Sequence, residues 1–114
     1  MPDPLATPNL TLPYIAAAQA QKHVTHNEAL RLLDGIVQLA VQSVGATTPP
    51  ANPVEGSRYL LGTTPAAAWN GQGGKLAAFV DGSWVFITPR TGWIVFDRAS
   101  ETLKVLKTTG WASV

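Results

Sequence analysis

Residues 11–44 read TLPYIAAAQAQKHVTHNEALRLLDGIVQLAVQSV and form the only long segment of the chain whose apolar residues recur with helical periodicity. Within this segment, Thr25 and Glu28 have the spacing of a capping box, in which an N-cap hydroxyl bonds the N3 amide and the N3 carboxylate reaches back to the N-cap amide. From Thr25 we predict a helix of roughly five turns that runs to about Val44, where Gly45 is placed to terminate it.

Two apolar rows follow the predicted helix. The first has the alternating three- and four-residue spacing of a helix packed on another helix, and its members are Leu30, Leu33, Val37, Ala40 and Val44. The second row lies beside it and comprises Ala29, Leu32, Ile36 and Leu39. A surface helix needs one apolar stripe, so a helix that is apolar over most of its circumference must be covered on two sides. We therefore predict that the first row is an oligomer interface with other copies of the chain.

The composition indicates one small domain that assembles with partners. Hydrophobic residues make up 46% of the 114 residues and charged residues 13%, against the roughly 25% charged residues usual in soluble domains. The net charge is +1 and the basic residues are scattered, so no nucleic-acid partner is expected. No apolar run approaches the roughly 20 residues of a membrane-spanning helix. Cysteine is absent, and the first residues lack the features of a signal peptide.

The N-terminal residues predict an extended docking arm. Four prolines among the first 13 residues favour a polyproline-like backbone. We expect the apolar residues of the arm to dock against a neighbouring subunit or a larger assembly, although a mobile terminus is the alternative. Polar residues further along can bond backbone groups across the same contact. The predicted docking residues are Leu10, Leu12, Tyr14, Ile15, Gln19, Gln21, His23 and His26.

Metal binding is a weaker interpretation of the same region. His23 and His26 are three residues apart with Glu28 nearby, but three ligands without a defined fourth do not specify a site. We expect hydrogen-bonded structural histidines, and predict no metal and no cofactor.

The second half of the sequence predicts antiparallel hairpins. Residues 45–57, GATTPPANPVEGS, have the composition of a linker. Asp81-Gly82 is the favoured sequence for a two-residue type I′ turn, and pairing across it gives Phe79–Trp84, Ala78–Val85, Ala77–Phe86 and Leu76–Ile87. A second hairpin joins residues 93–97 to 102–107, and a last half strand follows Thr109-Gly110.

The fold class predicted from these elements is α+β in a single compact domain. It consists of an extended arm over residues 1–13, one long helix within a helical segment over 14–44, the linker over 45–57, and a small antiparallel β-meander over 58–114.

Three tryptophans follow turns that contain glycine, and they allow two interpretations. Trp84, Trp93 and Trp111 can each close one end of a small sheet, or they can present flat exposed rings on which sugar rings stack. Burial separates the two interpretations.

Signatures of catalysis are absent from the sequence. It contains no Gly-x-Ser-x-Gly elbow, no phosphate loop and no His-Glu-x-x-His. Asp81 and Asp97 lie in or beside turns, where carboxylates bond backbone amides, and nothing positions a pair of acids across a cleft. We predict that the protein is not an enzyme.

Several motifs along most of the chain resemble a known domain. They are Leu12-Pro13-Tyr14-Ile15, the run from Gln19 to Leu30, Leu33-Asp34, Pro53-x-Glu55-Gly56-x-Arg58-Tyr59, Trp69, Asp81-Gly82-x-Trp84, and Pro89-Arg90-x-Gly92-Trp93. This pattern resembles an uncharacterised phage and prophage domain that occurs in tail-fibre-like proteins and in head-spike proteins of alphaproteobacterial gene transfer agents.

The resemblance implies a virion structural protein with no catalytic residues to carry over. Many relatives continue into a fibre or receptor-binding part, whereas this sequence ends at Val114, so we expect an oligomeric head-spike or fibre base or adaptor. The expected partners are further copies in a trimer or pentamer, capsid or other virion proteins, and a fibre protein. The expected location is the surface of a virus-like particle made in the bacterial cytoplasm. The alternative function is a module that binds a bacterial capsule or cell-surface glycan through the tryptophans.

Overall fold

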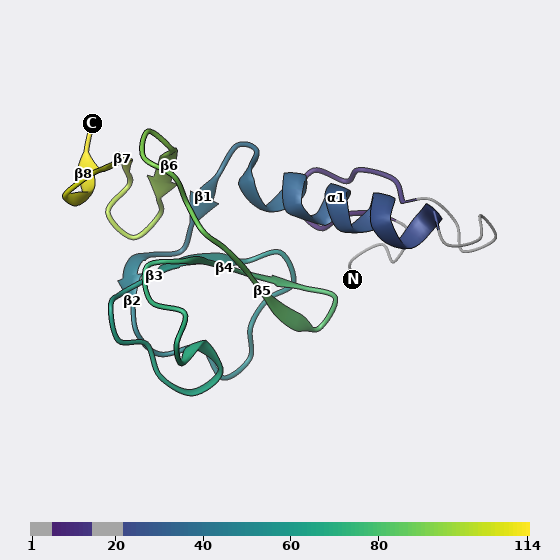
Figure 1. Cartoon of the computed structure of the whole chain (residues 1–114), viewed down its shortest axis with the longest axis horizontal. Coiled ribbons are helices and arrows are strands. Elements are labelled where there is room, and N and C mark those ends of the chain that lie inside the picture. The colour runs from purple at the N-terminus through teal and green to yellow at the C-terminus, as the bar shows by residue number, and fades with distance from the viewer. Residues whose placement is uncertain (1–5, 15–21) are drawn as a thin grey trace. The chain divides into compact units, whose positions relative to one another are not determined.

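The computed structural model describes residues 6–14 and 22–114. The chain forms two compact units, residues 1–37 and residues 38–114, and each is described by itself. The first contains the single α-helix of the described residues, α1 (Lys22–Ile36), and the second contains the strands (Figure 1).

The helix is shorter than the sequence predicted, and both predicted ends are wrong. It begins at Lys22, so Thr25 and Glu28 lie inside it and not at its N-cap, and it ends at Ile36 and not near Val44. The backbone N–H of Val37 still bonds the carbonyl of Leu33, at 2.9 Å, but Gln38 has a φ of 52°. A residue in this left-handed conformation ends a helix.

Residues 6–13 of the predicted arm form a closed loop and not an extended segment; residues 1–5 lie outside the described residues. Ala6 pairs with Pro13 in an antiparallel bridge, and the backbone N–H of Thr7 bonds the carbonyl of Leu12 at 2.9 Å. The hydroxyl of Thr7 in turn accepts the N–H of Leu12 at 2.8 Å. Pro8 lies in the turn that reverses the chain, a position its fixed φ suits. Pro8 therefore lies in a turn and not in an extended segment, and the extended prediction is wrong for residues 6–13.

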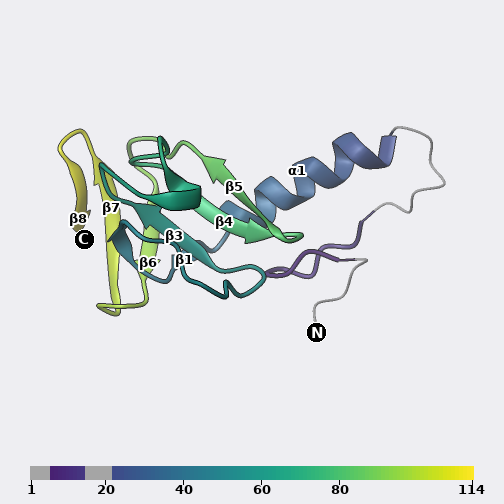
Figure 2. The same cartoon turned by 90° about the horizontal axis from the view of Figure 1, so that it is seen from below.

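The second unit contains two four-stranded mixed sheets, so the predicted α+β fold with one long helix is wrong and the protein is mostly β. One sheet has the order β1-β6-β7-β8 and the other β2-β3-β4-β5 (Figure 2). The strands are β1 (Ala40–Val41), β2 (Val44–Ala46), β3 (Arg58–Leu61), β4 (Leu76–Val80), β5 (Ser83–Ile87), β6 (Ile94–Asp97), β7 (Thr102–Lys107) and β8 (Gly110–Ser113). A 3-10 helix, η1 (Ala67–Trp69), lies between β3 and β4.

The difference from the prediction arises from the residues after Gln38. They contribute β1, which pairs in parallel with β6, and β2, which pairs in parallel with β3. Two of the five predicted interface residues, Ala40 and Val44, lie in these strands. The β-branched residues Val41 and Val44 suit a sheet, and their partners come from distant parts of the sequence.

The predicted hairpins are confirmed. Strands β4 and β5 pair in the predicted register, with Phe79 opposite Trp84. Asp81 and Gly82 both have positive φ, 55° and 75°, as a type I′ turn requires. Strands β6 and β7 form the second hairpin, and β8 pairs antiparallel with β7.

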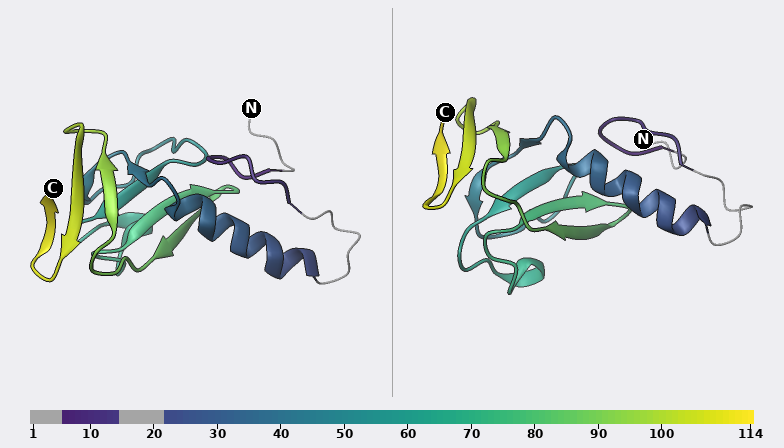
Figure 3. Two further views of the ribbon diagram at one scale, coloured as in Figure 1. Left: turned by 90° about the horizontal axis from the view of Figure 1, so that it is seen from above. Right: turned by 45° about the horizontal axis from the view of Figure 1, so that its top comes forward.

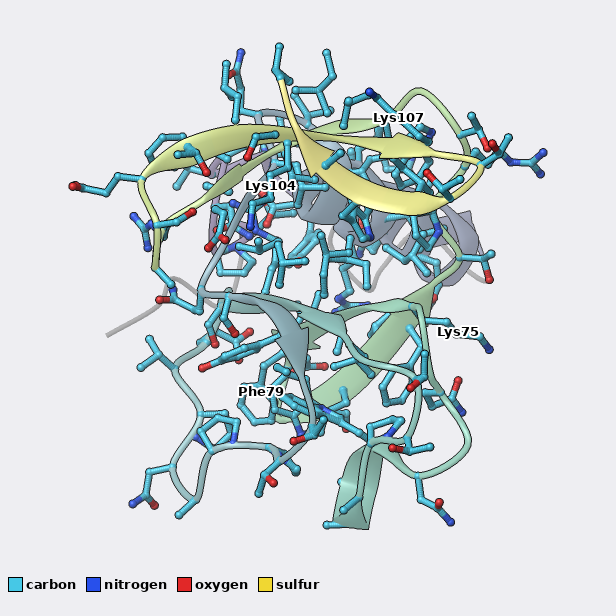
Figure 4. The ribbon with its side chains drawn as sticks, turned by 90° about the vertical axis from the view of Figure 1, so that its left-hand side faces the viewer. Lys75, Phe79, Lys104 and Lys107 are labelled. Carbon is cyan, nitrogen blue, oxygen red and sulfur yellow. The ribbon has the colours of Figure 1, made fainter. Side chains whose placement is uncertain are left out.

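The core of the second unit lies on both faces of the β2-β3-β4-β5 sheet. Leu60 and Leu76 are fully buried on one face, and Val41 and Val95 are fully buried on the other sheet; Figure 4 shows side chains filling the space between the two sheets. On the opposite face of β4, Ala77 packs with Leu61 and Trp69 in a small separate cluster. The sheet is therefore apolar on both sides.

Candidate assembly surfaces

A buried carboxylate fastens the N-terminal loop to the helix. Asp34 is 2% exposed. Its Oδ2 accepts both the backbone N–H and the side-chain Nδ2–H of Asn9, each at 2.9 Å, and its Oδ1 accepts the N–H of Leu10. A carboxylate removed from water needs such donors, and bonds to an ionised acceptor are stronger than neutral ones. The loop, coloured purple in Figure 3, is thereby held on one side of α1.

Other contacts extend this attachment along the helix. The guanidinium carbon of Arg31 lies 4.9 Å from the centre of the Tyr14 ring, a cation–π contact. Arg31 also lies 3.9 Å from the carboxylate of Glu28, one turn earlier in the helix. Asn27 is buried on the same side of α1 as Asp34.

The predicted docking residues are divided between this loop and other places. Leu10, Leu12 and Tyr14 are half-buried, and His26 is exposed on α1. Ile15, Gln19 and Gln21, together with the side chain of His23, lie outside the described residues. Docking through these residues stays a prediction.

An apolar stripe on α1 lies outside the side that Asn27 and Asp34 occupy. At 3.6 residues per turn, positions 29, 32, 33, 36 and 37 fall within one arc of about 140°, which runs from position 37, beside Asp34, to position 32 on the opposite side of the helix. Leu32, Leu33 and Val37 are 44%, 46% and 40% exposed, although burying such apolar side chains is favourable. We call this set the helix stripe; it comprises Ala29, Leu32, Leu33, Ile36 and Val37.

The predicted five-residue oligomer interface does not exist as one helical face. Leu33 and Val37 belong to the helix stripe, whereas Leu30 is half-buried one turn before Asp34. Ala40 and Val44 are half-buried in β1 and β2 of the second unit. Of the five predicted residues, only Leu33 and Val37 therefore lie on a common exposed surface. Leu32, which belongs to the second predicted row, lies on the same surface.

A second apolar surface lies on the β1-β6-β7-β8 sheet, and sequence analysis missed it. In this sheet Ile94 lies opposite Val105, Phe96 opposite Leu103, and Val105 opposite Ala112, so these side chains share one face. Ile94, Phe96 and Leu103 are 57%, 36% and 51% exposed. We call this set the sheet face; it comprises Ile94, Phe96, Leu103, Val105 and Ala112. No alternation of apolar and polar residues marks this face in the sequence, because Ile94-Val95-Phe96 is a continuous apolar run.

The other face of the same sheet carries a buried polar cluster. Asp97 is 3% exposed, and its Oδ2 accepts Lys104 Nζ at 2.9 Å and the hydroxyl of Ser100 at 3.0 Å, while Oδ1 accepts the N–H of Ala99. The Lys104 bond is the main reason that the pKa of Asp97 lies below its usual value. Figure 4 shows Lys104 reaching toward the other sheet and Lys107 on the outer side. The cluster fixes the β6–β7 hairpin.

The predicted tryptophans are half-buried. The Trp84 ring packs edge-on against Trp69 at 5.2 Å and against Phe79 at 5.1 Å between ring centres, and it lies 5.9 Å from Tyr59. Trp93 and Trp111 are also half-buried. Trp69, which the three-tryptophan pattern leaves out, is fully buried. Glycan stacking stays a prediction.

Neither metal-binding clusters nor membrane spans are found in the described part of the chain. No three His, Asp or Glu side chains there lie close enough together to hold a metal ion. No described helix has the length and apolar content needed to cross a membrane.

Comparison with known proteins gives one family. The model of a family described as "Protein of unknown function (DUF2793)" matches residues 26–112. Neither a curated protein nor a solved structure matches the chain.

Proposed function

The chain belongs to the DUF2793 family, whose function is unknown, and from the resemblance of its motifs to phage proteins and from its two apolar surfaces we propose that it is a non-enzymatic structural protein of a phage-like particle. In this role it is an oligomeric head-spike or fibre base, or an adaptor that joins the particle to a receptor-binding fibre. The resemblance of its motifs to phage and gene-transfer-agent proteins supports a place in a phage-like particle. The two apolar surfaces support assembly into an oligomer.

The observation that carries the proposal is the helix stripe. The loop that Asp34 holds covers one side of α1, and Leu32, Leu33 and Val37, which lie outside that side, are exposed. Burying a leucine or valine side chain is worth about 1.5–3 kcal/mol, so a partner that covers this stripe gains substantial stability. A contiguous exposed apolar surface of this kind marks an interaction site.

The expected assembly is a closed homo-oligomer, a trimer or a pentamer. Soluble homo-oligomers form closed point groups; three-fold symmetry suits a fibre and five-fold symmetry suits a capsid vertex. In this proposal the N-terminal loop, with Leu10, Leu12 and Tyr14, and the segment from Gln19 to His26 contact the particle. The partners are capsid or other virion proteins and a fibre protein.

Two measurements test the proposal. Density-gradient fractions of particles from a producing strain are probed for the protein by mass spectrometry, and the particles are imaged with an antibody raised against it. We expect the protein to co-sediment with the capsid and the antibody to label the particle surface. Its absence from intact particles in cells that express it would contradict the proposal.

A further inference from the structure

Each of the two units has an apolar surface that no described residue of its own unit covers: the helix stripe on the first unit and the sheet face on the second. We propose that they bind each other between neighbouring copies: the helix stripe of one chain lies on the sheet face of the next. This inference rests on the proposed oligomeric function and names the surfaces that build the oligomer.

The dimensions of the two surfaces match. The helix stripe extends over eight residue steps, from Ala29 to Val37, which is about 12 Å of helix. Along the strand direction, in which a helix that ends near Lys107 lies, β7 has six residues and is about 17 Å long. A helix laid on one face of a sheet is a standard way to bury both apolar surfaces, and here the two layers come from two chains.

The composition of the sheet face is that of the centre of an interface. Its five residues are apolar and include Phe96, and the cores of interfaces are depleted in charge and enriched in aromatic residues. Charged residues occur only at its ends: Lys107 closes β7 at one end, and Arg98 and Glu101 occupy the β6–β7 turn at the other.

The charges at the ends of the two surfaces are complementary. Arg98 and Glu101 offset each other, so the net positive end of the sheet face is at Lys107, with exposed Arg90 in the segment that leads into β6. The C-terminal end of a helix carries a partial negative charge, and the last turn of α1 contains no basic residue that would neutralise it. A helix that lies on the sheet face with its C-terminal end near Lys107 brings its partial negative charge next to the positive charge of Lys107.

Pairing of like surfaces is less favourable on the same grounds. Two sheet faces packed with parallel strands bring the two Lys107 side chains together. A single two-fold contact between like surfaces leaves the other apolar surface of each chain in water, and covering both in this way needs two different contacts in a dihedral assembly, not a trimer or pentamer. A helix-to-sheet contact covers both surfaces of every chain. Because it is heterologous, it closes into a ring of three or five copies when the rotation per contact permits.

The test mixes two variants, each defective in one surface. Leu33→Asp places a charge in the helix stripe and Leu103→Asp places one in the sheet face; both leucines are exposed, so both variants are expected to fold, as circular dichroism checks. Ser83→Asp, at an exposed position in β5 of the other sheet, is the control for an added carboxylate. One variant is labelled with ¹⁵N so that native mass spectrometry distinguishes chains of equal composition.

We expect the wild type and Ser83→Asp to form the ring and each leucine variant alone to be monomeric. An equimolar mixture of the two is expected to form a dimer with one chain of each kind, because the Leu103→Asp chain retains its helix stripe and the Leu33→Asp chain retains its sheet face. The dimer does not grow further, because its two remaining surfaces, the helix stripe of one chain and the sheet face of the other, each carry the substituted aspartate.

The other outcomes overturn the inference and separate it from the proposed function. If the wild type assembles but the mixture contains only monomers, or if either variant assembles alone, then the contact is not between the helix stripe and the sheet face, while the oligomeric function stands. If the wild type itself is monomeric, both proposals fail.

Discussion

Asn9 and Asp34 are 25 residues apart in the sequence, and Asn9 donates its backbone N–H and its side-chain Nδ2–H to the same oxygen of Asp34, each at 2.9 Å. This pair determines which side of α1 is covered. Since the loop occupies the side of Asp34, the helix stripe is left on the rest of the circumference, from Val37 beside Asp34 to Leu32 on the opposite side.

The first prediction concerns this attachment. Asp34→Asn keeps the size of the side chain but removes the charge and turns one oxygen into a donor that faces other donors. A hydrogen bond to a charged group contributes about 1.5–3 kcal/mol, so we expect the loop at residues 6–14 to lose about 2 kcal/mol of protection in hydrogen exchange.

Glu101→Gln is the control, because it removes the same charge from an exposed carboxylate in the β6–β7 turn of the second unit, which makes none of the described contacts to the loop. It is expected to leave the exchange of residues 6–14 unchanged. Equal protection in both variants would show that Asp34 does not hold the loop.

The second prediction is the pH dependence that Asp97 causes. Its pKa lies below the ordinary 3.8, first because of the bond from Lys104. The folded state therefore binds the proton less readily than the unfolded state, so this contribution to stability is complete well above pH 3.8 and is lost as the pH falls through the lowered folded pKa.

Urea unfolding of the wild type and of Asp97→Asn measures this contribution. We expect the stability difference between the two to shrink as the pH falls below 3.8, because protonation then removes in the wild type what the substitution removes at every pH. A difference that stays constant, or grows, toward low pH would contradict the assignment.

The third prediction concerns Trp84. Its edge-on contacts with Trp69 and Phe79 mean that Trp84→Ala leaves a gap beside the buried cluster, and large-to-small substitutions of aromatic residues cost about 3–5 kcal/mol when the site is fully buried. For this half-buried ring we expect about 2 kcal/mol in urea unfolding, and less for Trp84→Phe. An unchanged stability combined with lost binding to a capsular glycan would favour the glycan-binding alternative.

The features that sequence predicted correctly are those set by neighbouring residues. Asp81-Gly82 specifies a turn, and the turn fixes the register that places Phe79 opposite Trp84. The second hairpin follows in the same way. No information from elsewhere in the chain is needed for either.

The features that sequence missed depend on distant partners. Ala40 pairs with Phe96 and Val44 pairs with Leu60, and these parallel pairings turn the continuation of a helical pattern into two strands. The apolar spacing from Val37 to Val44 fits a helix as well as it fits this arrangement, so periodicity alone could not locate the end at Ile36.

The candidate surfaces show the same division. The uncovered helix stripe was expected in part, through Leu33 and Val37, because its spacing is local. The sheet face was not, since Ile94-Val95-Phe96 is a continuous apolar run and only the position of β6 inside a sheet shows which side chains face outward. The loop held by Asp34 was missed because the sequence position of a single acid in a helix does not indicate which residues it bonds.

The central claim is that other copies of the chain cover the helix stripe of α1. Sedimentation equilibrium of the wild-type protein, at concentrations from micromolar to hundreds of micromolar, tests this claim most directly. We predict one species whose mass is three or five times the 12.1 kDa of the monomer. A mass of 12.1 kDa at every concentration would contradict it.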